Sequence, residues 1–239
     1  MIQVIAFDLD DTLWSVGPII FKAERRLNDW LQQEVPQILY DVDSMRSLHH
    51  ELLELEPDLG NKITESRRRL IERALLLSKI NIDEATELSH QAMDVFLEAR
   101  NEIVFFEGAL EAISLLANQF TLGALTNGNA DIKKIGLDSY FSFAFSAEEV
   151  GAPKPAENLF RQALAHTNTR PQQMLYVGDN PVLDIDVANN IGMHTVWIKH
   201  PGQENTGETS ADEAIEHISD LPQAVNRILS RFNADHVGE

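Results

Sequence analysis

The 239-residue chain contains no cysteine. This absence excludes disulfide bonds, thiolate metal sites and cysteine nucleophiles, and it suits a reducing compartment. The chain also lacks an apolar run of the roughly 20 residues that a membrane-spanning helix needs. Its apolar first residues, Met1–Phe7, carry no basic stretch and lead straight into Asp8, unlike a signal peptide. We therefore expect a cytoplasmic protein.

Basic residues are scarce in this sequence. Lysine and arginine together number 19 against 38 aspartates and glutamates, which gives a formal net charge of −19. A surface of this charge repels nucleic-acid backbones and anionic membranes, so we expect neither as a partner. A local basic pocket can still hold a small anionic ligand. The sequence does not determine the oligomeric state, because no heptad pattern is sustained.

A helical pattern without strands occupies Pro18–Arg100. Apolar residues recur there in four stripes at helical spacing, as Leu27 and Leu31 do in the first. Asp83 is placed to act as the N-cap of the fourth helix. Four amphipathic helices in a row predict a small bundle inserted into another domain. We expect this inserted α-helical cap domain to comprise residues 15–103.

The rest of the sequence alternates between strands and helices. Short apolar runs that predict strands occur at Gln3–Phe7, Phe120–Leu125, Phe143–Phe145, Met174–Val177 and His194–Ile198. Helical segments are predicted between them, and a final helix follows over Leu221–Phe232. This alternation predicts an α/β fold with an open, mostly parallel, Rossmann-like sheet and helices on both faces. The predicted core domain comprises residues 1–14 and 104–239.

Polar residues follow four of the predicted strands or the loops beside them. They are Asp8 and Asp10, Thr126 and Asn127, Lys154, and Asp179 with Asp184 one helical turn further on. Each has an ordinary explanation, because carboxylates cap helices and a Thr-Asn-Gly triplet is common in turns. Ligands of parallel α/β sheets, however, bind outside the carboxyl ends of the strands. The combination therefore predicts a binding site at this edge.

The residue types at these strand ends suit phosphoryl chemistry. Asp8, Asp10 and Asp179 would repel one another unless a cation neutralised them. Oxygen ligands of this kind favour Mg²⁺, which pairs with substrate phosphate. Lys154 and Thr126 would help to balance the charge of a phosphoryl group. Two carboxylates on one turn can also divide their roles, one attacking phosphorus and the other transferring a proton.

Four sequence motifs at these positions resemble the signatures of the haloacid dehalogenase-like superfamily. In order along the chain they are Phe7-Asp8-Leu9-Asp10-Asp11-Thr12-Leu13, Leu125-Thr126-Asn127-Gly128, Lys154-Pro155 and Gly178-Asp179-Asn180-Pro181-Val182-Leu183-Asp184. Each motif alone is weak evidence, whereas four in the expected order at strand ends are strong evidence. The resemblance implies a Rossmann-like catalytic core and identifies the helical insert as the small cap of that superfamily.

The resemblance also implies a role for each matched residue. Asp8 would be the nucleophile that becomes an aspartyl-phosphate, and Asp10 the general acid and base. Thr126, Asn127 and Lys154 would hold the phosphoryl group, and Lys154 would take part in catalysis.

The same resemblance implies a Mg²⁺ site. Asp8, Asp179 and the backbone carbonyl of Asp10 would bind the ion, with Asp184 supporting it from close by. Asp11 and Asp186 fall outside the positions that the resemblance assigns a role, and we expect them to be solvated or to cap helices.

Asp10 favours a phosphatase over a dehalogenase. Dehalogenases resemble this sequence around Asp8 but generally lack the second acid, because a halide leaves without a proton whereas an alkoxide needs one. We therefore predict a Mg²⁺-dependent phosphomonoester hydrolase that acts on a small phosphorylated metabolite. The runs Phe-Asp-Leu-Asp-Asp-Thr-Leu-Trp and Leu-Thr-Asn-Gly-Asn-Ala are similar to a bacterial subgroup that dephosphorylates flavin mononucleotide or the ribityl-phosphate precursor of riboflavin. A phosphosugar mutase, a haloacid dehalogenase and a non-catalytic ligand-binding protein remain alternatives.

Further features concern the cap and its entry. The run Arg67–Arg69 either contacts an anionic substrate or pairs with Glu65 and Glu72 on a solvated helix face, and we favour pairing. Trp14 either stacks on a substrate ring or seats a hinge. Asn129 extends the phosphate turn and could reach the substrate. The chain passes twice between the predicted core and cap, which predicts a hinge that opens and closes.

Overall fold

The computed structural model describes residues 1–38 and 42–235, so residues 39–41 of the predicted cap and 236–239 of the predicted core lie outside the described residues. The chain divides into two compact units, which are described separately. The core unit comprises Met1–Ser15, Val104–Gly128 and Ile132–Glu239, and the helical unit comprises Val16–Ile103 and Asn129–Asp131. Residues 129–131 therefore group with the helical unit, outside the range predicted for the insert.

A parallel sheet forms the centre of the core unit. Its strands are β1 (Val4–Phe7), β2 (Thr121–Thr126), β3 (Phe141–Ser146), β4 (Met174–Gly178), β5 (His194–Ile198) and β6 (Glu213–Ile215). They follow the order β3-β2-β1-β4-β5-β6, and every pair is parallel. All four residues of β1 are buried, as expected for a parallel strand covered on both faces. The predicted open α/β sheet is confirmed, although β6 was not predicted.

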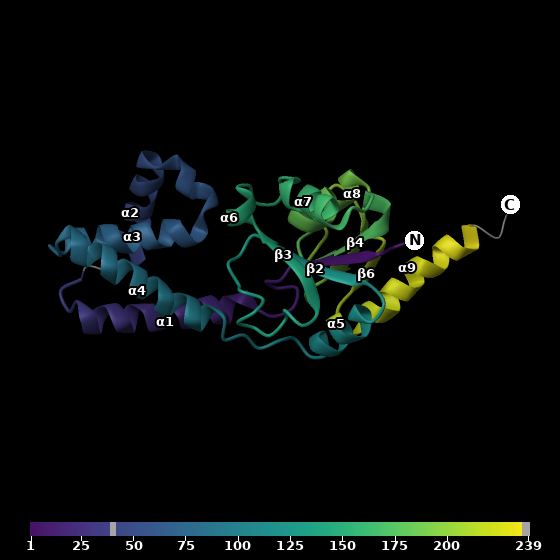
Figure 1. Cartoon of the computed structure of the whole chain (residues 1–239), viewed down its shortest axis with the longest axis horizontal. Coiled ribbons are helices and arrows are strands. Elements are labelled where there is room, and N and C mark those ends of the chain that lie inside the picture. Colours follow the sequence, from purple (N-terminus) through teal and green to yellow (C-terminus); the bar gives the residue numbers. More distant parts are fainter. Residues whose placement is uncertain (39–41, 236–239) are drawn as a thin grey trace. The chain divides into compact units, whose positions relative to one another are not determined.

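Helices cover both faces of this sheet. They are α5 (Ala109–Ala117), α6 (Ala147–Val150), α7 (Asn158–Thr167), α8 (Val187–Ile191) and α9 (Leu221–Asp235). Single turns lie at η2 (Pro171–Gln173), η3 (Pro181–Asp186, a π-helical turn) and η4 (Ile218–Asp220). Figure 1 shows α7 and α8 on one face and α5 and α9 on the other. A buried apolar cluster that includes Ala6, Phe160 and Tyr176 fills the α7 side.

The strand order reverses at β1, which is the topological switch point of the sheet. The chain adds β2 and β3 on one side of β1, and it adds β4, β5 and β6 on the other. Phe7 at the end of β1 is level with Ala124 of β2 and Val177 of β4. The residues that directly follow these three strands therefore meet at one edge, where parallel α/β sheets form a crevice.

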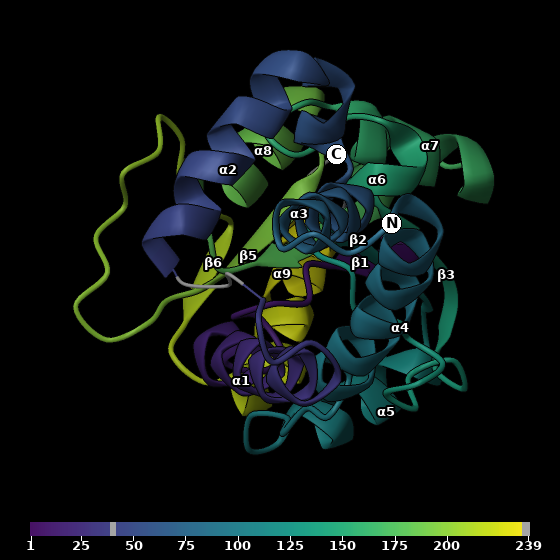
Figure 2. The same cartoon turned by 90° about the vertical axis from the view of Figure 1, so that its left-hand side faces the viewer.

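The described residues of the helical unit form four α-helices, as the apolar stripes predicted. They are α1 (Val16–Glu34), α2 (Val42–Leu55), α3 (Ile63–Leu77) and α4 (Ile82–Arg100), with a 3₁₀ turn η1 (Pro57–Asn61) before α3. Figure 2 shows α1 and α3 nearly end-on. Within residues 1–38 and 42–235, no helix combines the length and the apolar character needed to cross a membrane.

One predicted detail of the helical unit is wrong. The N-cap of α4 is Asn81, whose extended backbone lets its side chain accept the amide hydrogen of Glu84. The predicted cap, Asp83, lies inside the first turn instead, where its negative charge interacts favourably with the helix dipole.

Candidate active site

All the predicted site residues line one cleft of about 180 Å³ in the core unit. The cleft is lined by Asp8, Asp10, Asp11, Thr126, Asn127, Gly128, Lys154, Asp179, Asn180, Leu183 and Asp184. Asp8 directly follows β1, Thr126 ends β2 and Asp179 directly follows β4. Two larger hollows along α7 are lined by none of these residues. The cleft is therefore the place where the candidate side chains converge.

The ammonium group of Lys154 occupies the floor of the cleft. Its Nζ donates hydrogen bonds to Asp8 Oδ1 at 2.6 Å, to Asp184 Oδ1 at 2.7 Å and to the Tyr176 hydroxyl at 2.9 Å. Burial alone would disfavour the charged amine, but Asp184 and Asp8 outweigh it and hold the pKa of Lys154 well above its usual value. Lys154 is therefore a fixed positive charge next to Asp8.

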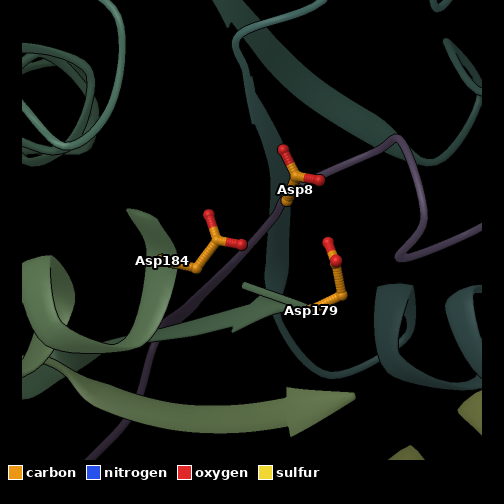
Figure 3. Close-up of side chains that lie close together, drawn as sticks. All are labelled: Asp8, Asp179 and Asp184. Carbon is orange, nitrogen blue, oxygen red and sulfur yellow. The ribbon is translucent and has the colours of Figure 1, made fainter. Parts of the chain in front are cut away.

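Three carboxylates surround the same point. One oxygen each from Asp8, Asp179 and Asp184 lies within 4.8 Å of the other two, and Figure 3 shows the three carboxylates close together at the strand ends. Burial raises the pKa of Asp8 to about 8 even though Lys154 opposes the shift. Burial and the charge of Asp184 raise the pKa of Asp179 to about 6. The cluster thus carries more negative charge than Lys154 neutralises, which fits a divalent cation.

The donor set at this cluster suits Mg²⁺, because it consists of carboxylate oxygens. Asp8 and Asp179 belong to the set, as expected from the sequence, and Asp184 is its third carboxylate. The carboxylate of Asp10 is directed elsewhere. Its Oδ1 accepts a hydrogen bond of 2.8 Å from the indole nitrogen of Trp14.

Trp14, which donates this hydrogen bond to Asp10, lies in the protein interior. Its side chain is fully buried, and its ring meets Phe105 edge-on with 5.8 Å between ring centroids. The backbone carbonyl of Trp14 also accepts the amide hydrogen of Asp11 at 2.8 Å. A ring buried in this way is not available to stack on a substrate, so the structure favours a positioning role for Trp14.

Asn127 contacts the backbone of Lys154 through both ends of its amide. Its Oδ1 accepts the Lys154 amide hydrogen at 2.8 Å, and its Nδ2 donates to the Lys154 carbonyl at 3.0 Å. Next to it, the hydroxyl of Thr126 accepts the amide hydrogen of Gly128 at 2.9 Å. The side chain of Asn127 therefore fixes the lysine loop, which the sequence motif did not indicate.

The close approach of η3 to β4 depends on Gly178. A Cβ atom at this position would lie 2.5 Å from the carboxyl carbon of Asp184. Asp184 in turn accepts the backbone amide hydrogen of Asn180 at 3.0 Å, which closes the turn. The glycine of the fourth motif is thus required for the position of Asp184 beside Lys154.

Several residues near the site were not identified from the sequence. The Thr12 hydroxyl donates to Asp179 Oδ1 at 3.2 Å, and the side chains of Trp197 and Gln203 both donate to the Asp179 carbonyl. The buried hydroxyl of Tyr176 accepts a hydrogen bond from Lys154 Nζ. Thr12 lies in the first motif, in the turn after β1, but was given no role there. Tyr176 and Trp197 lie in apolar strands and Gln203 in an irregular loop, where sequence spacing gives no signal of a contact with the cleft.

Asp186 is buried rather than solvated, contrary to one part of our expectation, and it takes the N-cap position of α8 without a capping hydrogen bond to its side chain. It is buried and accepts hydrogen bonds from the Glu208 amide at 2.8 Å, the Thr209 amide at 2.7 Å and the Thr209 hydroxyl at 2.6 Å. It anchors the loop that follows β5. Local sequence patterns do not indicate this contact, because the partners of Asp186 lie more than 20 residues further along the chain.

The arginine run of the helical unit is engaged in ion pairs. Arg67 pairs with Glu24, Arg68 with Glu65 and Glu72, and Arg69 with Glu56 and Glu72. The guanidinium of Arg67 also lies 4.0 Å from the centre of the Phe96 ring. The favoured pairing with Glu65 and Glu72 is confirmed for Arg68 and Arg69, whereas Arg67 pairs with Glu24 and the face is partly buried rather than solvated. Asn129 likewise donates to the Thr64 hydroxyl of the same unit.

Comparison with known proteins identifies the family. The sequence profile of the haloacid dehalogenase-like hydrolase family matches residues 2–192. The chain is 32% identical over 218 residues to the 5-amino-6-(5-phospho-D-ribitylamino)uracil phosphatase YigB of Escherichia coli, covering 91% of each protein. It is 27% identical to the glyceraldehyde 3-phosphate phosphatase of Pyrococcus furiosus, covering 97% of this chain and 95% of the relative. The chain belongs to the haloacid dehalogenase-like hydrolase family, and it is an enzyme.

A solved structure gives the same result for the fold. The crystal structure of a protein named 2-haloacid dehalogenase from Pseudomonas syringae superimposes with a TM-score of 0.91 at 36% identity, covering 95% of this chain and 99% of that one. The resemblance based on the four motifs is thereby confirmed. Relatives of comparable similarity are named a phosphatase and a dehalogenase, so their names alone do not define the reaction, and the residues of the site must distinguish the two.

Proposed function

We propose that this enzyme is a Mg²⁺-dependent phosphomonoester hydrolase that works through an aspartyl-phosphate on Asp8. The observation that carries the proposal is the pair of carboxylates Asp8 and Asp10, which line one cleft together with the buried ammonium of Lys154. The names of the curated relatives, both phosphatases, support the same reaction. The core unit would carry out the chemistry, and the helical unit, as the cap, would select the substrate.

The first half of the reaction uses both aspartates. A carboxylate oxygen of Asp8 attacks phosphorus while the bond from phosphorus to the ester oxygen breaks. Asp10 gives its proton to the leaving alkoxide. Lys154 and the hydroxyl of Thr126 hold the negative oxygens of the phosphoryl group as it transfers. A Mg²⁺ ion held by Asp8, Asp179 and the Asp10 carbonyl, with Asp184 beside it, would supply further neutralisation of this charge.

The second half releases phosphate. Asp10, now ionised, takes a proton from a water molecule as that water attacks phosphorus, and the bond from phosphorus to Asp8 breaks. Both aspartates return to their starting protonation states. Trp14 supports these two proton transfers, because its indole hydrogen bond holds Oδ1 of Asp10 and so fixes the orientation of the carboxyl group.

A panel of phosphate esters with Mg²⁺ tests this proposal. We expect turnover in the wild-type protein, loss of turnover on chelation of divalent cations, and recovery when Mg²⁺ is restored. The panel should include flavin mononucleotide and 5-amino-6-(5-phospho-D-ribitylamino)uracil, which we propose as substrates on the basis of the 32% identical relative. Hydrolysis of none of the esters by the folded, Mg²⁺-loaded protein would overturn the proposal.

The second candidate is a haloacid dehalogenase, which the name of the 36% identical structure favours. The two reactions are distinguished by their products. A dehalogenase releases halide from 2-chloropropionate, and the presence of Asp10 is unnecessary for that step. Halide release without any phosphatase activity would favour this candidate. A mutase would instead return an isomeric phosphosugar rather than free phosphate.

A further inference from the structure

Tyr176 lies directly beneath the cleft, although it belongs to none of the four motifs. It is the third residue of β4, its side chain is fully buried, and it is part of the apolar cluster on the α7 face. Its ring meets Phe160 edge-on with 4.7 Å between the ring centroids. This packing fixes the ring, and with it the position of the hydroxyl at the ring's end.

The hydroxyl of Tyr176 joins three segments of the site. It accepts a hydrogen bond from Lys154 Nζ at 2.9 Å. It lies 3.1 Å from the Leu125 carbonyl and 3.3 Å from Asp184 Oδ1, and its single hydrogen can be donated to either. Leu125 immediately precedes Thr126, so one phenol oxygen connects the lysine loop to the end of β2.

Tyr176 differs in kind from the other two acceptors of Lys154. An ammonium group has three hydrogens, and here they go to Asp8, Asp184 and Tyr176. When Asp8 bonds to phosphorus it loses its charge, and the ammonium hydrogen that it accepted turns to the phosphoryl oxygens. Asp184 lies in the carboxylate cluster that fits a cation. The phenol is neutral and is held by packing, so it is the acceptor that stays constant through the reaction.

We propose that Tyr176 is a positioning residue that holds Lys154 Nζ in line with the phosphoryl group. The inference rests on the proposed phosphatase function and adds a residue to it. Without the hydroxyl, the lysine would still be charged, but its remaining hydrogen-bond acceptors would be Asp8 and Asp184. Asp8 loses its charge during the reaction, and Asp184 also faces the cation site. The contact of the lysine with the phosphoryl oxygens would then be less well aligned when charge develops in the transition state.

The variant Tyr176→Phe tests this inference, because it removes one oxygen and keeps the ring. Tyr140→Phe is the matched control, since Tyr140 is a partly exposed tyrosine of the core unit outside the cleft. We expect kcat/KM for para-nitrophenyl phosphate to fall about tenfold in Tyr176→Phe, mostly through kcat, and to stay unchanged in the control. Inhibition by orthovanadate, which mimics the transition state, should weaken by a similar factor.

The vanadate measurement separates positioning from a purely structural role. An inhibition constant does not depend on how much of the protein is active, so a loss of folded enzyme alone would leave it unchanged. A lower melting temperature with vanadate inhibition and kcat/KM within twofold of wild type would overturn the inference. A second test uses Lys154→Met, in which further removal of the Tyr176 hydroxyl should lower neither activity nor vanadate affinity. An additional loss in that double variant would also contradict the inference.

Two remaining outcomes are informative as well. If the wild-type protein hydrolyses no ester, the phosphatase proposal fails, whereas an active wild type with an unaffected Tyr176→Phe rejects only the role of Tyr176. If Tyr176→Phe does not fold, 3-fluorotyrosine at position 176 keeps the packing and makes the oxygen a weaker acceptor. We expect a smaller decrease in kcat/KM there, and a wild-type rate would overturn the inference.

Discussion

The carboxylates of the two units have opposite electrostatic surroundings. In the helical unit, carboxylates such as Glu65 pair with arginines, and the hydrogen bond from Arg68 holds the pKa of Glu65 below its usual value. In the cleft of the core unit, Asp8 and Asp184 share one lysine, and burial raises the pKa of Asp8 and Asp179. These arginines of the helical unit have carboxylate partners beside them, whereas the carboxylates of the cleft outnumber their one lysine and fit a cation.

The largest expected effect comes from the buried nucleophile. Asp8→Asn keeps the shape of the side chain but removes its nucleophilic oxygen, so we expect kcat to fall by about 10⁴-fold or more. Steady-state hydrolysis of para-nitrophenyl phosphate measures this loss. Glu102→Gln is the matched control, because Glu102 pairs with Lys22 and Arg26 within the helical unit. Equal rates in Asp8→Asn and wild type would exclude the assignment.

Asp10→Asn should have the next largest effect, and its size should depend on the leaving group. An alkoxide needs a proton as it departs, whereas para-nitrophenolate hardly does. We expect kcat to fall about 10²- to 10⁴-fold for alkyl phosphates and distinctly less for para-nitrophenyl phosphate. Rates for a series of esters with different leaving groups measure the difference. The same loss for every ester would mean that Asp10 is not the acid.

The crowded carboxylates predict an unusual dependence of stability on pH. The folded pKa of Asp179, about 6, exceeds its usual value of 3.8, so the folded state holds a proton that the unfolded state has lost. In the metal-free protein this contribution to stability is present below about pH 4 and is lost as the pH rises through about 6. Asp8 extends the loss to about pH 8.

Mg²⁺ should reverse that loss, because the cation takes the place of the protons. We expect the gain in melting temperature on adding Mg²⁺ to be small near pH 5 and to grow toward pH 8. Thermal unfolding with and without Mg²⁺ measures it, and Asp179→Asn should flatten the dependence. A gain that does not change with pH would argue against a cation at these carboxylates.

The smallest effects on catalysis are expected from the arginines of the helical unit. Arg68→Met breaks a partly buried ion-pair cluster, so it should lower the free energy of unfolding by about 1 kcal/mol. It should leave kcat/KM for acetyl phosphate within twofold of wild type. Thermal unfolding and steady-state kinetics check the two statements. A large change in KM for an organic phosphate, without a change for acetyl phosphate, would indicate instead that Arg68 contacts the substrate.

Much of the fold and of the candidate site was predictable because it depends on local patterns. Buried parallel strands appear as short apolar runs, and polar residues at their ends mark the cleft. Strand β6 escaped prediction because it has only three residues and starts with a charged one, Glu213. Its place in the sheet comes from pairing with β5, which the sequence pattern does not contain.

The orientation of side chains within the site was less predictable. Tyr176 has the pattern of a core residue, because its ring is packed there, and only the position of its hydroxyl connects it to Lys154. The motif that contains Asp10 does not indicate that Trp14 donates a hydrogen bond to its carboxyl group, or that the cluster of carboxylates is formed by Asp8, Asp179 and Asp184. Such contacts depend on hydrogen-bond directions between segments, and sequence spacing does not define these directions.

The central claim is that Asp8 becomes covalently phosphorylated. It is tested most directly by quenching the enzyme in acid during turnover of a phosphate ester and reducing it with borohydride, which converts an acyl phosphate to an alcohol. Peptide mass spectrometry should then find homoserine in place of Asp8, only with Mg²⁺ present and not in Asp8→Asn. Release of phosphate with unmodified Asp8, or with the modification at another residue, would contradict the account.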